Sequence, residues 1–145
     1  YGQVFVYYNL NSKANTLTTA DADVTITSAN TAGSFGFSLA TGDFSGDGVD
    51  DLAVSAPGND LGETYVYDNQ PSDFGGVYMF SGADMPSSGS VDESAAGASI
   101  IGSDEDLFGF ALGAGDISGD GTSDILVTAP LWDGEEGAFY VFEMP

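Results

Sequence analysis

Two short stretches of this chain carry aspartates at a density that needs a physical reason. Residues 42–58 read GDFSGDGVDDLAVSAPG, with four aspartates within nine residues and glycines between them. Like charges at this density repel, since two carboxylates about 4 Å apart cost about 4 kcal/mol at an effective dielectric of about 20. A bound cation would replace that repulsion with attraction, so the stretch is a candidate metal site.

The same arrangement occurs twice. Residues 35–57 (FGFSLATGDFSGDGVDDLAVSAP) and 108–130 (FGFALGAGDISGDGTSDILVTAP) align without gaps at a spacing of 73, with 14 identities in 23 positions. A lone Asp-Gly pair indicates an ordinary hairpin turn. Aspartates at loop positions 1, 5 and 9 of both copies favour metal binding, because a plain turn has no reason to keep the repulsion twice.

The spacing within each loop indicates which atoms would bind the ion. Oxygen side chains at positions 1, 3 and 5, a glycine at 6 and a backbone carbonyl at 7 also open the EF-hand loop. The glycine permits the sharp bend, with φ above zero. Position 12, where an EF-hand closes with a glutamate, is Val54 in a predicted strand, so the aspartate at position 9 must close the site.

The predicted ligands follow from this numbering. They are Asp43, Ser45, Asp47, Asp51 and the Val49 carbonyl in the first loop, and Asp116, Ser118, Asp120, Asp124 and the Thr122 carbonyl in the second. Oxygen donors without nitrogen or sulfur favour Ca²⁺, with Mg²⁺ a poorer fit, so the sequence predicts two calcium sites. Position 8 differs between the copies, Asp50 against Ser123, and we interpret Asp50 as a solvated residue.

Composition excludes several classes of partner. The chain has 145 residues, 23 acidic and one basic (Lys13), which gives a net charge of -22. A surface of that charge does not bind nucleic acid and is unsuited to anionic lipid. No apolar run approaches the roughly 20 residues of a membrane helix, so no membrane insertion is expected. The chain begins at Tyr1 without Met, which predicts a processed chain or a piece of a longer one.

The sequence gives little support to an enzyme. Without histidine or cysteine, Ser-His-Asp and Cys-His mechanisms are excluded. Carboxylate or metal-assisted hydrolysis would need acids outside the loops, and none of them stands in a recognisable catalytic spacing. Those acids are Asp60, Glu63, Asp68, Asp73, Asp133, Glu135 and Glu136. We therefore predict no catalytic residues here, while an activity elsewhere in a longer protein stays open.

The elements that would position the loops are short strands. Aromatic and β-branched runs beginning at glycine occupy 2–8, 75–82 and 137–143, and weaker alternating runs lie at 23–29 and 95–102. With one strand on each side of each loop, this predicts about nine strands. Four antiparallel strands per cycle form the unit of a β-propeller blade. We therefore predict an all-β, incomplete propeller: the last two strands of a blade (1–30), a complete blade (31–103) and three strands of the next (104–145).

Paired motifs flank both loops and carry a family resemblance. Phe35-Gly36 precedes the first loop and Ala56-Pro57 follows it; Phe108-Gly109 and Ala129-Pro130 flank the second. This pattern resembles the FG-GAP repeat, which builds the β-propeller of integrin α subunits and of many bacterial and archaeal surface proteins. The resemblance covers nearly the whole chain. It implies that the aspartate at position 9 closes each site and that further blades come from the same gene or from other chains.

The resemblance also shapes the functional expectation. It implies an extracellular or cell-surface module with structural calcium that mediates adhesion or binds a protein or glycan ligand. Ligand-binding loops would lie on the rim opposite the calcium loops, at residues 58–74 and 131–136, and Phe35, Phe37, Phe108 and Phe110 would pack between blades. Two alternatives stay open: a propeller region of a secreted hydrolase or lyase, and a structural unit of a surface filament or layer.

Overall fold

The computed structural model describes residues 2–13, 15–28, 34–58, 75–102 and 106–145. The predicted all-β fold is confirmed in this part of the chain. Its strands are β1 (Gln3–Val6), β2 (Val24–Thr27), β3 (Leu39–Gly42), β4 (Asp51–Ala56), β5 (Gly76–Phe80), β6 (Gly89–Asp92), β7 (Ala98–Ile101), β8 (Leu112–Gly115), β9 (Asp124–Ala129) and β10 (Ala138–Phe142). Short helical turns are η1 (Leu10–Ser12), η2 (Thr19–Asp21), η3 (Glu93–Ala95) and α1 (Trp132–Glu135).

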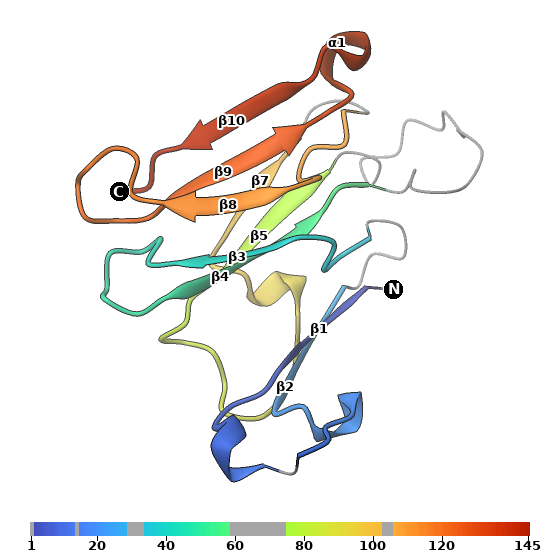
Figure 1. Ribbon diagram of the computed structural model, residues 1–145, viewed down its shortest axis with the longest axis vertical. Coiled ribbons are helices and arrows are strands. Elements are labelled where there is room, and N and C mark those ends of the chain that lie inside the picture. Colours follow the sequence, from blue (N-terminus) through green and yellow to red (C-terminus); the bar gives the residue numbers. More distant parts are fainter. Residues whose placement is uncertain (1, 14, 29–33, 59–74, 103–105) are drawn as a thin grey trace.

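These strands form three sheets that do not close into a ring (Figure 1). The first sheet has the order β1-β2-β6, the middle sheet β3-β4-β5-β7 and the third sheet β10-β9-β8. Every pairing within the middle and third sheets is antiparallel. The middle sheet lies between the other two, so the order of the sheets in space follows the order of the repeats along the chain.

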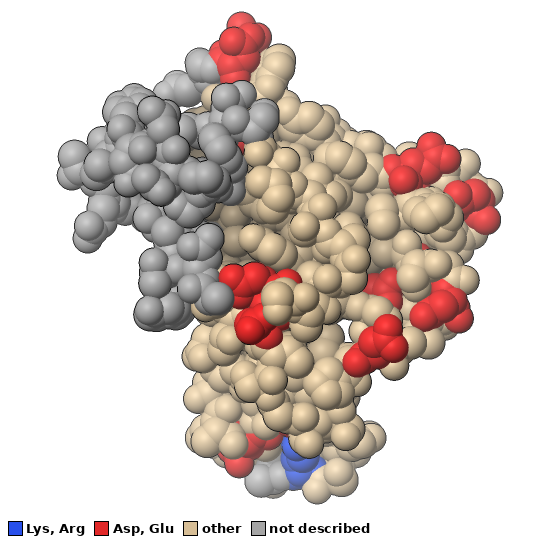
Figure 2. All heavy atoms as spheres, turned by 180° about the vertical axis from the view of Figure 1, so that it is seen from behind, with Lys and Arg blue, Asp and Glu red and all other residues tan. Residues whose placement is uncertain are grey.

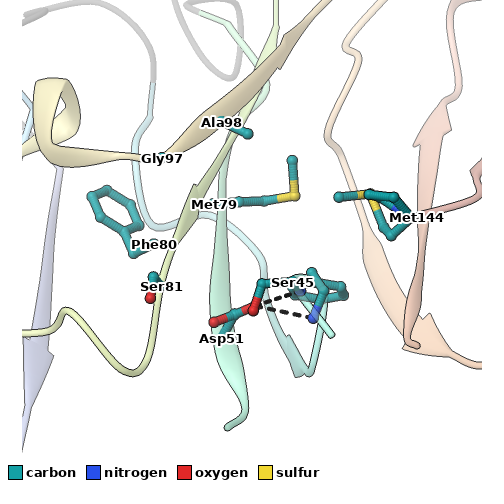
Figure 3. A pocket seen from close by; sticks show the side chains of 10 residues that line it. Ser45, Asp51, Met79, Phe80, Ser81, Gly97, Ala98 and Met144 are labelled. Atoms are coloured by element: carbon teal, nitrogen blue, oxygen red, sulfur yellow. Dashed lines mark hydrogen bonds between the residues drawn. The ribbon is translucent and has the colours of Figure 1, made fainter. Parts of the chain in front are cut away.

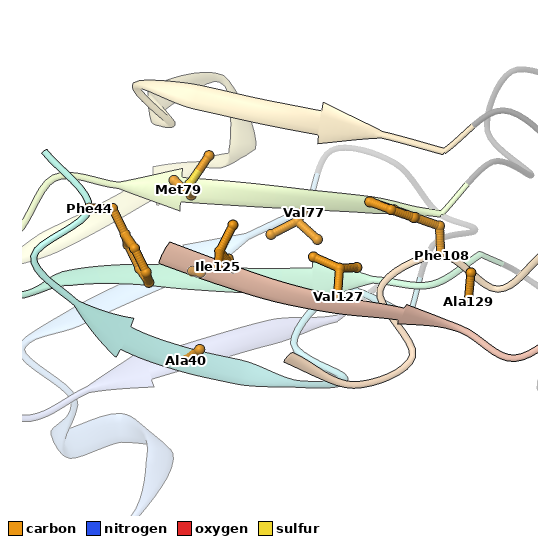
Figure 4. Close-up of a cluster of buried hydrophobic side chains, with 9 residues drawn as sticks. Ala40, Phe44, Val77, Met79, Phe108, Ile125, Val127 and Ala129 are labelled. Carbon is orange, nitrogen blue, oxygen red and sulfur yellow. The ribbon is translucent and has the colours of Figure 1, made fainter. Parts of the chain in front are cut away.

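Two apolar layers hold the three sheets together. Figure 4 shows the layer between the middle and third sheets, where Val77 and Met79 face Ile125 and Val127. The layer between the first and middle sheets contains Val24, Ile26, Val54 and Phe80, among others. Consecutive residues of β4 are therefore both buried, Ala53 in one layer and Val54 in the other. A strand covered on both faces loses the alternation of apolar and polar residues that marks a half-buried strand.

Each Phe-Gly pair places its phenylalanine, here called the aromatic wedge, at the junction between two neighbouring sheets. Phe35 packs against Tyr78 and Phe80, and Phe108 packs against Tyr140 and Phe142, with ring centroids 5.5 to 6.5 Å apart. Both wedges are buried, as predicted. The glycine after each wedge has positive φ, 87° at Gly36 and 92° at Gly109, a conformation that glycine adopts without steric cost.

The second phenylalanine of each FGF motif behaves differently. Phe37 and Phe110 contact each other across the middle and third sheets, with ring centroids 5.2 Å apart. They nevertheless keep 44% and 38% of their surface exposed. The prediction that they pack between sheets is thus confirmed for their mutual contact, but they are not core residues.

Glycine precedes β1 and β5 for a steric reason. A Cβ atom on Gly75 would lie 1.9 Å from the carbonyl oxygen of Phe108, and one on Gly2 would lie 1.8 Å from that of Phe35. The backbone of Phe35 therefore lies directly against Gly2, just before β1, and that of Phe108 lies directly against Gly75, just before β5. No residue with a side chain fits there without moving the two sheets apart.

The strand β6 is a tenth strand that the sequence did not predict. It lies in the connection between β5 and β7, yet it pairs with β2 of the first sheet and runs parallel to it. Its sequence is GSVD, too short and too polar to show an alternating pattern. This parallel pair departs from the otherwise antiparallel arrangement and joins the middle repeat to the first sheet.

Substitution of Gly75 tests the contact that spaces the sheets. We expect Gly75→Ala to lower the free energy of unfolding by about 2 kcal/mol or more, because overpacking against backbone typically costs about 1–3 kcal/mol. Gly97→Ala is the matched control, since a Cβ there meets nothing within 4 Å. Urea denaturation of both variants measures the difference, and equal stabilities would contradict the steric explanation.

Candidate metal-binding loops

Both Asp-Gly loops are hairpin connections at the same end of their sheets. Residues 43–50 join β3 to β4, and residues 116–123 join β8 to β9. Figure 1 shows the two loops side by side at the left, with α1 at the opposite end of the third sheet. The repeat thus places two sets of candidate ligands next to each other.

The loop backbone curls around the first aspartate in each copy. The Asp43 carboxylate accepts hydrogen bonds from the backbone N–H groups of Asp47 (3.1 Å) and Gly48 (2.9 Å). In the second loop, the Asp116 carboxylate accepts the corresponding bonds from Asp120 (3.1 Å) and Gly121 (3.1 Å). The predicted bend at loop position 6 is present, with φ of 86° at Gly48 and 100° at Gly121.

The aspartate at position 5 fixes the residue two positions further on. Asp47 accepts a hydrogen bond from the N–H of Val49 (2.8 Å), and Asp120 accepts one from the N–H of Thr122 (2.9 Å). The Thr122 hydroxyl also donates to Asp120 at 2.6 Å. That hydroxyl, followed by the backbone N–H of Thr122, lowers the pKa of Asp120 below its ordinary value. Both loops therefore share these backbone hydrogen bonds, and the second loop adds the Thr122 hydroxyl bond and a bond of 2.6 Å from the N–H of Gly119 to Asp116.

The aspartate at position 9 is buried at the base of each loop. Figure 3 shows Asp51 accepting hydrogen bonds from the N–H groups of Phe44 and Ser45, both at 3.0 Å. Its other oxygen accepts from the N–H of Gly82 (2.9 Å), just after β5. One carboxylate thus ties together the start of the loop, the start of β4 and the end of β5.

The second loop repeats this arrangement at Asp124. Its carboxylate accepts hydrogen bonds from Ile117 (2.8 Å) and Ser118 (2.9 Å), and from Met144 (3.2 Å) after β10. The Ser118 bond is the main cause that holds the pKa of Asp124 below its ordinary value. The sequence predicted position 9 as a ligand, but it carried no signal for the bonds to Gly82 and Met144.

The donor chemistry of both loops fits a hard cation. Carboxylates, serine hydroxyls and backbone carbonyls are the oxygen donors that Ca²⁺ takes, and neither loop offers a nitrogen or sulfur side chain. The arrangement of the carboxylates does not form a finished cage. Across the described residues, no group of three or more acidic side chains comes together in a way that could hold a metal ion. The ligand residues therefore stay a prediction.

A cavity of about 280 Å³ lies beside the first loop (Figure 3). Its walls are mostly apolar. They come from the loop, from β5 and β7 and from the end of the chain: Phe44, Ser45, Asp51, Met79, Phe80, Ser81, Gly97, Ala98, Met144 and Pro145. Asp51 turns its oxygens toward loop backbone, so the cavity offers no charged group free to orient a polar ligand.

Acidic side chains lie over much of the surface that Figure 2 shows. Figure 2 shows acidic side chains at the end that carries the two loops, on the right in that view. Lys13, the only basic residue, lies at the bottom and contacts Asp23, with 2.9 Å between Nζ and Oδ1. This hydrogen bond lowers the pKa of Asp23. The loop end thus carries negative charge without a nearby basic side chain.

The other predicted positions are only partly described. Residues 59–74 lie outside the described part of the chain, and with them most of the proposed rim loop and the acids Asp60, Glu63, Asp68 and Asp73. Trp132 begins α1 and keeps 40% of its surface exposed. An exposed tryptophan at the end opposite the Asp-Gly loops agrees with the predicted rim position.

Asp51 gives a direct test of how the loop base is held. Asp51→Asn replaces one accepting oxygen with an NH₂ group that faces backbone donors, so we expect a loss of about 2–3 kcal/mol in unfolding free energy. Asp50→Asn, one residue earlier and exposed, is expected to change stability by less than about 0.5 kcal/mol. Chemical denaturation at fixed calcium compares the two variants; equal losses would mean that charge, rather than hydrogen bonding, matters here.

Comparison with known proteins places these loops in a family. The chain is 32% identical to integrin alpha-5 of Xenopus laevis over 116 residues, which is 74% of the chain and 9% of that protein. It is 29% identical to integrin alpha-V of Gallus gallus over 99 residues, 67% of the chain and 8% of that protein. The chain thus spans less than a tenth of these relatives. Within the described residues, no helix is long and apolar enough to cross a membrane.

The family model of the FG-GAP repeat matches the chain in two places. The matched segments are residues 35–78 and 108–142, which together make up more than half of the chain. Each segment contains one Phe-Gly pair, one Asp-Gly loop and one Ala-Pro pair, the three features on which the resemblance was based. The chain belongs to the FG-GAP repeat family.

Proposed function

We propose that this chain is a calcium-binding β-propeller module of a cell-surface or secreted protein, with an adhesive or ligand-binding role. Calcium is structural in this proposal. The chain's own residues have no enzymatic role, which agrees with the absence of histidine and cysteine. The observation that carries the proposal is the pair of loops with matching hydrogen-bond patterns, both inside matched FG-GAP segments.

The ligands follow from the loop pattern. Asp43, Ser45, Asp47, Asp51 and the Val49 carbonyl would hold one ion, and their equivalents at 116, 118, 120, 124 and 122 would hold the other. The ion supplies positive charge among carboxylates that otherwise repel. The hydrogen bonds that Asp43 and Asp47 accept keep the loop curled, which limits the ordering that binding requires.

We also propose that the free face of the third sheet is covered by a further blade. Phe44, Val77 and Met79 of the middle sheet are 3%, 0% and 6% exposed. Their repeat equivalents are Ile117, Phe139 and Val141, as the spacing of 73 and the pairing registers with β4 and β9 establish. These three are 56%, 58% and 46% exposed. These positions are buried in the middle sheet by the third sheet, but in the third sheet they are apolar and exposed. This difference supports a further blade that would cover the third sheet.

A protein or glycan ligand would bind at the end opposite the calcium loops. Trp132 is the described residue that best supports this, since exposed tryptophan is common at binding surfaces. Rigid sheets would then separate the ligand site from the ions, so calcium would act on binding through stability alone.

Removal of calcium tests the metal proposal. Loops of extracellular modules bind at about 10⁻⁴ to 10⁻³ M, so millimolar calcium stabilises the native state by about 1 kcal/mol per site. For a domain of this size that corresponds to about 2–4 °C per site, so we expect chelation at constant ionic strength to lower Tm by several degrees. Calorimetry with and without chelator measures the shift.

Two substitutions distinguish the effect of calcium binding in the loops from the effect of the chain's overall negative charge. Asp47→Asn is expected to remove about half of the calcium-dependent shift, because the second loop stays intact, whereas Asp50→Asn leaves it unchanged. High monovalent salt screens the net charge of -22 but does not substitute for calcium. An unchanged Tm on chelation, with no ion among Asp43, Asp47 and Asp51 in a calcium-containing crystal, would reject the proposal.

Phe139 tests the missing neighbour in the natural, full-length polypeptide. If a further blade covers this face, Phe139→Asp buries a carboxylate and is expected to cost at least about 2 kcal/mol. Leu10→Asp is the control, since Leu10 is 59% exposed on η1, against 58% for Phe139. Denaturant titration compares the variants; two equally small effects would show that the third sheet ends the fold.

A further inference from the structure

The two Asp-Gly loops are in direct contact. The backbone N–H of Ser123, position 8 of the second loop, donates a hydrogen bond of 2.8 Å to the carbonyl oxygen of Asp43, position 1 of the first loop. The first predicted ligand is therefore held from two directions. Its carboxylate accepts N–H groups of its own loop, and its carbonyl accepts one from the neighbouring loop.

Two glycines of the first loop region permit this approach. A Cβ atom on Gly42 would lie 2.7 Å from both Cβ and Oγ of Ser123. One on Gly46 would lie 3.1 Å from the Thr122 methyl group, and Gly46 also has a positive φ of 74°. A side chain at Gly42 would force the loops apart, and one at Gly46 would press on the Thr122 methyl group, so these glycines let the loops lie close together.

The contact has a direction along the chain. Gly115 and Gly119 are the equivalents of Gly42 and Gly46 in the second repeat, and a Cβ on either meets nothing within 4 Å. Asp50, the equivalent of Ser123, is exposed. Within the described residues, position 8 of the second loop thus contacts position 1 of the first, whereas Asp50, position 8 of the first loop, makes no equivalent contact with the second. Position 8 therefore differs between the copies in its surroundings as well as in its residue type.

We infer that the two loops form one coupled unit, in which ordering of the second loop raises the calcium affinity of the first. This inference rests on the proposed calcium binding. When the second loop is ordered, its hydrogen bond from Ser123 restrains the Asp43 backbone. The first loop then loses less conformational freedom when it binds calcium. Such coupling is reciprocal, and the first ion must raise the affinity of the second loop by the same factor.

The experiment combines a contact variant with a loop variant in the 145-residue chain, in which no neighbouring loop among the described residues lies against Gly115. Calcium chloride is titrated while the backbone amide resonance of Gly48 reports on the first loop. Asp120→Asn, which weakens the second loop, is expected to raise the first loop's Kd about fivefold, the change that loss of one ordinary hydrogen bond gives. In the Gly42→Ala background, where the loops are separated, Asp120→Asn is expected to change that Kd less than about 1.5-fold.

Gly115→Ala is the matched control. It places the same substitution before the other loop, where the added methyl group meets nothing, so the fivefold effect of Asp120→Asn is expected to persist. A Gly48 resonance that responds to calcium with the same Kd with and without Asp120→Asn would overturn the coupling and leave calcium binding intact.

A measurement without calcium keeps the coupling testable if no ion binds. Amide hydrogen exchange of Asp47 and Gly48 is expected to be faster in Gly42→Ala than in Gly115→Ala, because only the former separates the loops. A Gly48 resonance that ignores calcium in every variant would overturn the proposed calcium function and with it the calcium coupling. Equal exchange rates in the two glycine variants would overturn the contact between the loops as a source of order.

Discussion

The contact between a phenylalanine carbonyl and a glycine determines the spacing of the whole structure. The Phe108 backbone rests on Gly75, and the Phe35 backbone rests on Gly2, each across a junction between sheets. Because this contact is between backbone atoms, no change of side-chain rotamer can relieve it, so a larger residue at either glycine must change the separation of the sheets. The aromatic wedges, the two apolar layers and the alignment of the loops all follow from that separation.

The loops depend on this spacing because they belong to different sheets. Ser123 reaches the carbonyl of Asp43 only if β3 and β8 lie side by side at the correct distance. The buried aspartates add a second constraint, since Asp51 and Asp124 each tie a loop to the end of its own aromatic strand. The geometry of each loop therefore depends on how the sheets pack, even though its acidic residues lie close together in the sequence.

The positions of most strands and of both loops were predictable because they depend on local sequence patterns. Aromatic runs beginning at glycine marked β1, β5 and β10, and the 73-residue spacing marked both loops. The strand β6 was missed because its partner, β2, lies in another repeat and supplies the hydrogen bonds that its polar sequence does not predict. Ser123 was missed for a similar reason: its role depends on a neighbouring loop, and comparison of the two copies shows only that position 8 varies.

Because of the parallel strand β6, the sequence repeat and the folded sheet do not have the same boundaries. It is encoded within the middle repeat but completes the first sheet, so a cut between sheets leaves β2 with an open edge. Duplication or loss of one repeat would therefore move a strand that belongs to a neighbour. An engineer who recombines these repeats must therefore keep residues 89–92 in the same molecule as β1 and β2, the strands whose sheet they complete.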